Sequence, residues 1–406
     1  ELKDLGYQLK DMIGKDGIEK TYDKYLRGID GGQQLEIDVY GRPVKTVGAL
    51  EPIPGADVKL TIDLELQEIV EKNLEGKWGA VVVMDPRSGE ILAMANRPSY
   101  DPNIFAAPLD RREWERMDRA GHPFLNRVLS TYPPGSTFKV VNLSATLQEG
   151  TERLDDLIEC KGSFVLGNRV AKCWREAGHG KLNILEGLVH SCDIVFYELG
   201  LKNGPGIISK YAREYGLGAR TGIDLPGELT GLVPTEDWKR RIYKDVWVKG
   251  DSINYGIGQG FLTVTPIQMA NVFAMIATSK RYIPHVVSSI SSRSGQEIFR
   301  YKVHEAGGAP ISEENLRLLR STMREVVKRG TGIAAEVKGI PAAGKTGTAE
   351  NPGKAHAWFM CYAPYENPEI VIVTFIEHGE HGDRVTAYIA REILKWYRDN
   401  RLGVRG

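Results

Sequence analysis

A serine and a lysine follow a proline-rich turn in residues 132–139. Two prolines and a glycine precede Ser136 and cannot continue a helix, so we expect a helix to begin at or near Ser136. Lys139 then lies one turn further on, on the same helix face. The positive helix end and burial would both disfavour its ammonium form, which suits a base acting on the Ser136 hydroxyl. A capping serine beside a solvated lysine is the alternative, and a single S-x-x-K match does not decide between them.

A second hydroxyl and a carboxylate occur two positions apart at Ser191 and Asp193. They lie between two helical patterns, and side chains at this spacing do not share a helix face. We therefore expect them in a loop that lines a cleft.

A third motif, Lys345 to Thr348, lies in an extended segment before two late strand patterns. Gly347 permits a ligand to approach the backbone closely. Lys345, together with the hydroxyls of Thr346 and Thr348, suits an anionic carboxylate. S-x-x-K, S-D-N and K-T-G in this order are typical of penicillin-binding proteins and serine β-lactamases, and Ser191, Cys192 and Asp193 stand at the middle motif.

Three cysteines and a histidine, the residues Cys160, Cys173, His179 and Cys192, are separated by thirteen, six and thirteen positions. Three thiolates and one imidazole match a structural zinc site. A hairpin over residues 162–172 would bring Cys160 and Cys173 together, which also leaves a disulfide between them open. Unrelated buried thiols are the third interpretation, and His190 is a possible replacement ligand.

The elements that must position these groups follow from the hydrophobic pattern. Strand patterns at both ends of residues 56–406 enclose a mainly helical middle, which indicates an α+β core with one sheet built from distant strands. Residues 1–55 read as a small pedestal or linker module without a cluster of catalytic residue types. The expected helices are 2–25 (interrupted at two glycines), 63–73 and 384–398; the expected strands are 33–39, 43–49, 80–84, 90–94, 357–362 and 370–376. Cys361, within a late strand, is expected to be a core residue.

The amino-acid composition excludes several classes of protein. The 406 residues carry 53 basic and 53 acidic side chains, and this balance argues against a nucleic-acid binder held mainly by phosphate contacts. Hydrophobic residues at 42% and charged residues at 26% are ordinary globular values and exclude a disordered or fibrous chain. No apolar run approaches the roughly eighteen residues of a membrane helix. The charged start without a methionine leads us to expect that any membrane anchor precedes the sequence.

The sequence resembles class B penicillin-binding proteins, most of all the penicillin-binding protein 2 type that acts in cell elongation. Besides the three motifs, the resemblance rests on residues 17–28, 85–89, 98–103, 126–135, 256–260 and 265–268. It implies a transpeptidase domain over residues 56–406, with a central antiparallel sheet flanked by helices and a helical subdomain, behind a partial pedestal at 1–55. It also implies a single inner-membrane anchor with the body in the periplasm.

The resemblance further implies acyl transfer without a catalytic cofactor. Ser136 would attack the penultimate D-alanine carbonyl of a peptidoglycan stem peptide, with Lys139 as base and Ser191 relaying a proton between the two lysines and the leaving D-alanine. The implied oxyanion donors are the backbone N–H groups of Ser136 and Thr348, and Lys345, Thr346 and Thr348 would hold the terminal carboxylate. β-Lactam antibiotics would acylate the same serine. A membrane glycosyltransferase and rod-shape proteins are implied partners.

Asp193 stands where the middle motif often has asparagine, which adds a negative charge near the lysines; this matches the elongation type. Some proteins of that type carry a metal in the region of the cysteine cluster, which favours zinc.

Other functions remain open from the sequence. A serine β-lactamase would need a carboxylate that activates water, and Glu236 is the candidate by position. A D,D-carboxypeptidase shares the same catalytic residues. A non-catalytic sensor or scaffold that binds β-lactams or wall fragments is the non-enzymatic alternative.

Overall fold

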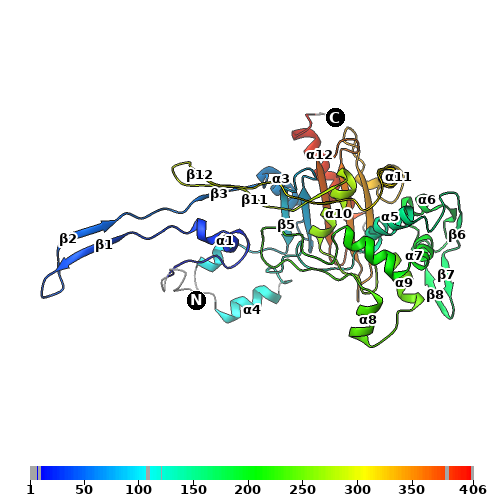
Figure 1. Ribbon diagram of the computed structural model, residues 1–406, viewed down its shortest axis with the longest axis horizontal. Coiled ribbons are helices and arrows are strands. Elements are labelled where there is room, and N and C mark those ends of the chain that lie inside the picture. Colours follow the sequence, from blue (N-terminus) through cyan, green and yellow to red (C-terminus); the bar gives the residue numbers. More distant parts are fainter. Residues whose placement is uncertain (1–6, 8–10, 107–109, 120, 380–383, 404–406) are drawn as a thin grey trace. The chain divides into compact units, whose positions relative to one another are not determined.

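The computed structural model describes the chain except for residues 1–6, 8–10, 107–109, 120, 380–383 and 404–406 (Figure 1). Its contacts form two compact units. Unit 1 comprises residues 1–61, 223–226 and 285–302, and unit 2 comprises residues 62–222, 227–284 and 303–406. The boundary expected after residue 55 falls within the first segment of unit 1. In the described ranges, no helix combines the length and apolar character needed to cross a membrane.

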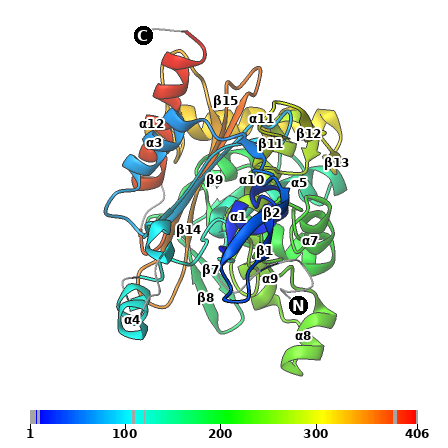
Figure 2. The same ribbon diagram turned by 90° about the vertical axis from the view of Figure 1, so that its left-hand side faces the viewer.

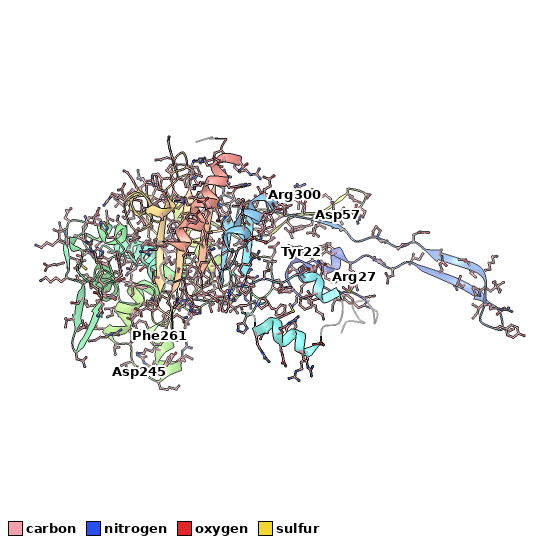
Figure 3. All side chains as sticks on the ribbon, turned by 180° about the vertical axis from the view of Figure 1, so that it is seen from behind. Tyr22, Arg27, Asp57, Asp245, Phe261 and Arg300 are labelled. Atoms are coloured by element: carbon pink, nitrogen blue, oxygen red, sulfur yellow. The ribbon has the colours of Figure 1, made fainter. Side chains whose placement is uncertain are left out.

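Unit 1 contains two small sets of antiparallel strands. Strands β1 (Gly32–Ile37) and β2 (Pro43–Leu50) form the hairpin that the sequence predicts. Strand β3 (Asp57–Leu60) pairs with β11 (Val287–Ser291), and β11 pairs with β12 (Glu297–Arg300); Asp57 and Arg300 are labelled in Figure 3. This pairing draws a distant segment into unit 1, which the sequence pattern does not reveal.

The helix predicted over residues 2–25 is wrong in extent. The structure has two short helices, α1 (Gly17–Thr21) and α2 (Asp23–Leu26), and residues 11–15 have no regular secondary structure. Gly17 adopts a positive φ of 57°, which ends any continuous helix there. The rest of the predicted helix includes residues 1–6 and 8–10, which lie outside the described part.

Unit 2 is built on a five-stranded antiparallel sheet in the order β14-β15-β16-β4-β5. The strands are β4 (Gly79–Met84), β5 (Ile91–Arg97), β14 (Ala343–Ala349), β15 (His356–Ala363) and β16 (Ile370–Ile376). The first and last parts of the unit thus share one sheet, which confirms the α+β prediction. Cys361 is fully buried in β15, as expected.

Helices cover both faces of this sheet (Figures 1 and 2). Helices α3 (Leu64–Asn73) and α12 (Val385–Asn400) pack together over one face and bury a single apolar core that includes Leu66, Val70, Ile389 and Ile393. Asp63 caps α3 by accepting a hydrogen bond from Leu66 N at 3.2 Å, at the start of the helix that the sequence predicts over residues 63–73. The other face is covered by α10 (Pro266–Thr278), which contacts β4, β15 and β16.

The remaining elements form the helical part of unit 2 and three small two-stranded sheets. The helices are η2 (Pro102–Ala106), α4 (Arg111–Arg119), η3 (Gly135–Phe138), α5 (Lys139–Glu149), α6 (Ile184–Val189), α7 (Asp193–Glu214), α8 (Glu236–Tyr243), α9 (Lys249–Gly256), α11 (Glu313–Lys328) and η4 (Ile333–Ala335). The paired strands are β6 (Ile158–Cys160) with β9 (Gly180–Leu182), β7 (Ser163–Leu166) with β8 (Arg169–Lys172), and β10 (Lys280–Tyr282) with β13 (Glu305–Gly308).

Candidate active site

Ser136 lies in the single 3-10 turn η3, directly before α5. The turn enters with Gly135 at a φ of 53°, and the Gly135 N–H donates to the carbonyl of Gly258 at 3.0 Å. Ser136 remains partly exposed, and its hydroxyl makes no hydrogen bond among the described residues. Lys139 is the first residue of α5. The predicted helix start is therefore correct, with a tighter first turn than expected.

Strand β14 packs directly against this turn. A Cβ on Gly135 would lie 2.3 Å from the Thr348 carbonyl oxygen, and one on Gly347 would lie 2.7 Å from Thr137 Cγ2. Both positions therefore require glycine for the two backbones to approach. This contact brings the first and third sequence motifs together across more than two hundred residues.

Lys139 is fully buried, and its Nζ faces the middle motif. It donates to the Ser191 carbonyl at 2.9 Å and to Asp193 Oδ1 at 2.8 Å, and it lies 3.4 Å from Ser191 Oγ. The Phe196 ring lies on another side, with its centroid 5.3 Å from Nζ. Asp193 thus supplies the charge partner that a buried lysine needs.

Lys345 reaches the same hydroxyl from β14. Its Nζ donates to Ser191 Oγ at 2.8 Å and to the Thr346 carbonyl at 2.9 Å, and the side chain is fully buried. Burial, and then the nearby charge of Lys139, hold the pKa of Lys345 well below the usual lysine value, while Asp193 acts in the opposite direction. Two lysines therefore meet at one serine oxygen.

Ser191 holds this position with an unusual backbone. Its φ is 53°, a left-handed conformation that a non-glycine residue adopts only when its surroundings hold it. The carbonyl of Ser191 accepts from Trp174 Nε1 at 3.1 Å, besides the bond from Lys139. The backbone N–H of Trp174 donates to Asp193 Oδ2 at 2.9 Å. Trp174 therefore binds both ends of the middle motif.

Sequence reasoning missed Trp174, and it also missed Thr331. The Thr331 hydroxyl lies 2.6 Å from that of Thr346, and the Thr331 N–H donates to the Val189 carbonyl at 3.4 Å. The only signal for Trp174 is that it follows Cys173 directly. The signal for Thr331 is its place between Gly330 and Gly332. That pattern predicts a turn but does not show that the turn lies beside Thr346.

The four predicted metal ligands do come together. The ligand atoms of Cys160, Cys173, His179 and Cys192 all lie within 4.8 Å of one another, and His179 Nδ1 is 3.5 Å from Cys160 Sγ and 3.6 Å from Cys173 Sγ. Tetrahedral zinc with bonds of about 2.0–2.3 Å requires ligand separations of this size. His190 is outside this cluster; its Nε2 lies 3.4 Å from Glu186 Oε2.

The thiols of this cluster are free, so Cys160 and Cys173 are not joined. A hydrogen bond from Cys192 lowers the pKa of Cys173 to about 5, and the same contact raises the pKa of Cys192. Burial lowers the pKa of His179, which keeps its imidazole neutral. A thiolate and a neutral imidazole are the forms that bind zinc, so the donor set fits the metal.

Glu236, the candidate for activating water, begins α8 and is exposed. No hydrogen bond or ion pair in the described structure connects it to Ser136 or to the lysines. Gln259 is nearer to β14, since its Nε2 lies 3.5 Å from the Thr348 carbonyl.

Comparisons with known proteins give a consistent result. The peptidoglycan D,D-transpeptidase MrdA of Acinetobacter baumannii is 33% identical over 97% of this chain and 62% of its own length. The protein of the same name from Escherichia coli strain K12 is 32% identical over 94% of this chain and 64% of its own length. This chain therefore spans less than two thirds of those relatives.

Two solved structures have the same fold. One is penicillin-binding protein PBP2 in its complex with MreC from Helicobacter pylori, with a TM-score of 0.87 and 30% identity over 98% of this chain and 75% of that one. The other is Pseudomonas aeruginosa PBP2 in complex with WCK 5153, with a TM-score of 0.83 and 32% identity over 96% and 85%.

Family matches cover both ends of the chain. Residues 1–60 match the penicillin-binding protein dimerisation domain, and residues 79–395 match the penicillin binding protein transpeptidase domain. The second match includes more than half of the sequence and all the motifs described above. The chain belongs to the penicillin-binding protein transpeptidase family.

Proposed function

We propose that this protein is a serine D,D-transpeptidase that cross-links peptidoglycan stem peptides through an acyl-enzyme on Ser136. One observation supports the proposal: Lys139 and Lys345 converge on Ser191 Oγ, and Lys139 begins the helix that follows the turn carrying the partly exposed Ser136. A serine hydroxyl one helical turn from a buried lysine suits nucleophilic acyl transfer.

In the first step, Ser136 Oγ attacks the carbonyl carbon of the penultimate D-alanine, and Lys139 accepts the hydroxyl proton. The backbone N–H groups of Ser136 and Thr348 stabilise the oxyanion. As the ester forms, the amide bond to the terminal D-alanine breaks, and its nitrogen receives a proton through Ser191. An amine of a second stem peptide then attacks the ester, a new amide forms, and Ser136 regains its proton.

Substrate binding is assigned to β14. The Lys345 side chain and the hydroxyls of Thr346 and Thr348 hold the terminal carboxylate, while Gly347 leaves room for the peptide backbone. Asp193 balances the positive charge that Lys139 carries once it has accepted the proton. β-Lactams, which mimic the D-Ala-D-Ala end, acylate the same serine.

A structural zinc ion is part of this proposal. Cys160, Cys173, His179 and Cys192 would hold it, and it would supply rigidity rather than catalysis. Cys192 lies between Ser191 and Asp193, and Cys173 precedes Trp174, whose N–H groups bind both of those residues. A zinc ion bound to these two cysteines would therefore hold Ser191 and Asp193 in place.

The cellular setting is proposed from the relatives. One solved relative forms a complex with MreC, and another structure is described as structural coordination of polymerization and crosslinking by a peptidoglycan synthase complex. We infer that this protein acts in cell elongation with rod-shape proteins and a membrane glycosyltransferase. We also infer an inner-membrane anchor and a periplasmic body.

The test uses a donor peptide ending in D-Ala-D-Ala and a second stem peptide with a free side-chain amine. Mass spectrometry should detect both D-alanine and a cross-linked product, and Ser136→Ala should yield neither. Release of D-alanine with a hydrolysed donor alone would assign the protein as a carboxypeptidase instead. Neither product from the folded wild type would contradict the proposal.

A further inference from the structure

A pocket of about 570 Å³ lies at the opposite edge of the five-stranded sheet from β14. Edge strand β5 ends at Arg97, and residues 98–101 continue along the pocket; α3 contributes Glu71 and the segment before β4 contributes Trp78. Four strand spacings separate the two sheet edges, which corresponds to roughly 19 Å. The pocket is therefore distinct from the proposed acyl-transfer site.

Trp78 presents an exposed indole in a fixed position. Trp78 is 47% exposed. Its backbone is held in place, because its carbonyl accepts from the Glu377 N–H at 2.7 Å. A Cβ on Gly121 would lie 2.9 Å from the ring atom Cζ2 and 3.0 Å from Pro98 Cγ, so the chain packs tightly against one side of the ring. Its indole N–H has no partner among the described residues. A held aromatic face with a free donor is a ready contact for a ligand.

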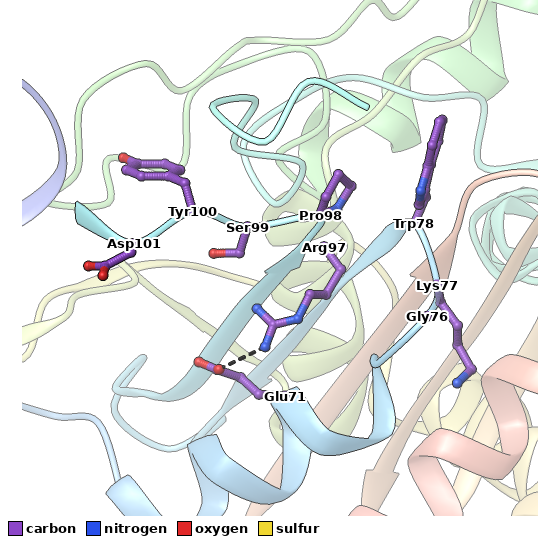
Figure 4. A pocket seen from close by; sticks show the side chains of 9 residues that line it. All are labelled: Glu71, Gly76, Lys77, Trp78, Arg97, Pro98, Ser99, Tyr100 and Asp101. Atoms are coloured by element: carbon purple, nitrogen blue, oxygen red, sulfur yellow. Dashed lines mark hydrogen bonds and ion pairs between the residues drawn. The ribbon is translucent and has the colours of Figure 1, made fainter. Parts of the chain in front are cut away.

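The polar groups of the pocket offer donors and acceptors together. Arg97 Nη2 donates to Glu71 Oε2 at 3.0 Å, and Figure 4 shows this pair with Ser99 and Asp101 further along the chain, while the Trp78 ring points in another direction from the neighbouring segment. Both members of the pair are partly exposed, at 25% and 41% of their side chains. A guanidinium has five N–H groups, and those not used within the chain remain for a ligand. Ser99 is exposed as well.

The charges identify the kind of ligand. Two cations, Arg97 and Lys77, and two carboxylates, Glu71 and Asp101, line the pocket, so its formal charge is zero. Phosphates and other anions would face both carboxylates, and a purely apolar ligand would leave the polar groups unpaired. A neutral ligand rich in hydroxyl and amide groups, with C–H faces that stack on indole, satisfies every group.

From this we infer that the pocket binds the glycan strand of peptidoglycan, as a subsite for neutral β-1,4-linked N-acetylated sugars. The inference rests on the proposed function, because that function brings a glycan carrying stem peptides to the enzyme. Trp78 stacks on the face of one sugar, and the Arg97–Glu71 pair binds hydroxyl or acetamido groups of another sugar of the same strand. The subsite would hold the strand while its stem peptide is processed elsewhere.

The experiment is a calorimetric titration of the full chain with the β-1,4-linked tetramer of N-acetylglucosamine. Trp78→Ala should weaken binding by about tenfold, the scale of one lost aromatic contact. Ser99→Glu, which adds bulk and a further carboxylate at an exposed position, should weaken it too. The matched control is Tyr388→Ala on α12, an aromatic that is 48% exposed outside the pocket, and it should bind as the wild type does.

Acylation by benzylpenicillin separates this inference from the proposed function. Trp78→Ala and Ser99→Glu should be acylated at the wild-type rate, since neither residue belongs to the acyl-transfer site, and this also establishes that they fold. Absent tetramer binding by an acylating wild type would overturn the glycan subsite alone. So would unchanged binding by both pocket variants, or displacement of the tetramer by a sugar-free stem peptide. Tetramer binding without acylation would leave the subsite standing and remove the proposed function.

Discussion

Nζ of Lys345 lies 2.8 Å from Oγ of Ser191 in a fully buried setting. The lysine comes from an edge strand of the sheet and the serine from the junction of two helices, so the contact joins the two halves of unit 2. Lys139, the other lysine at Ser191, has the carboxylate of Asp193 as a charge partner. The hydrogen-bond partners of Lys345 in the described part of the chain are neutral, and burial lowers its pKa.

This difference predicts a pH-dependent stability. The native chain releases the Lys345 proton at a lower pH than the unfolded chain, whose lysines titrate near about 10.4. Between those two values the unfolded chain binds more protons, so the free energy of unfolding rises with pH. Lys345→Met removes this penalty and should stabilise the protein at pH 7 by about 1 kcal/mol or more. The gain should shrink towards pH 10, as measured by denaturant unfolding.

Lys338→Met is the control for this series, because Lys338 is exposed and should give no pH-dependent difference from the wild type. Equal destabilisation of Lys345→Met at pH 7 and pH 10 would show that burial does not govern the state of this lysine.

Asp193→Asn should slow acylation by benzylpenicillin by roughly 10- to 100-fold, the cost of losing one or two charge-assisted hydrogen bonds. Asparagine has no negative charge beside Lys139 Nζ. Only one of its two side-chain polar atoms is an acceptor, so it cannot replace both carboxylate oxygens that accept from Lys139 and from the Trp174 N–H. Stopped-flow kinetics would measure the rate, with the exposed Asp156→Asn as the control. A wild-type rate in Asp193→Asn would mean that the carboxylate has no part in the site.

Close packing at the nucleophile turn gives a paired glycine test. Gly135→Ala places a Cβ 2.3 Å from the Thr348 carbonyl oxygen and should reduce acylation by more than about 100-fold, because the reacting groups and the oxyanion donors no longer align. Gly150→Ala is the matched control. Gly150 has a φ of 63° and open space around it, so only backbone strain of about 1 kcal/mol is expected. Similar acylation by the two variants would refute the packing argument.

Zinc content should be close to one ion per chain by elemental analysis, and Cys173→Ser should lower both metal content and penicillin acylation. Acidification should release the metal, because protons compete for thiolates and imidazole. Cys361→Ala, a change at a buried cysteine outside the cluster, should retain the ion. A metal-free preparation with full acylation would contradict the proposed role of the cluster.

Much of this arrangement was predictable from local pattern. The prolines and glycine before Ser136 mark a helix start, and the strand patterns of residues 80–84, 357–362 and 370–376 correspond to neighbouring strands. The spacing of the cysteines and His179 also predicted their meeting. These features depend on short-range sequence signals or on matching hydrophobic strands.

Other features depend on contacts between distant segments and left no local signal. The left-handed backbone of Ser191 results from the bonds that Lys139 and Trp174 make to its carbonyl. The pairing of β11 with β3 is set by packing within unit 1. Residues 11–15 were predicted within a helical pattern but have no regular structure, and the helix begins only at Gly17.

Ser136 as the acylated nucleophile can be tested by intact-mass spectrometry after mixing with benzylpenicillin. We expect a one-to-one adduct that persists for hours in the wild type and is absent from a folded Ser136→Ala variant. Rapid loss of the adduct with drug hydrolysis would indicate a β-lactamase. An adduct that survives in Ser136→Ala would contradict the account outright.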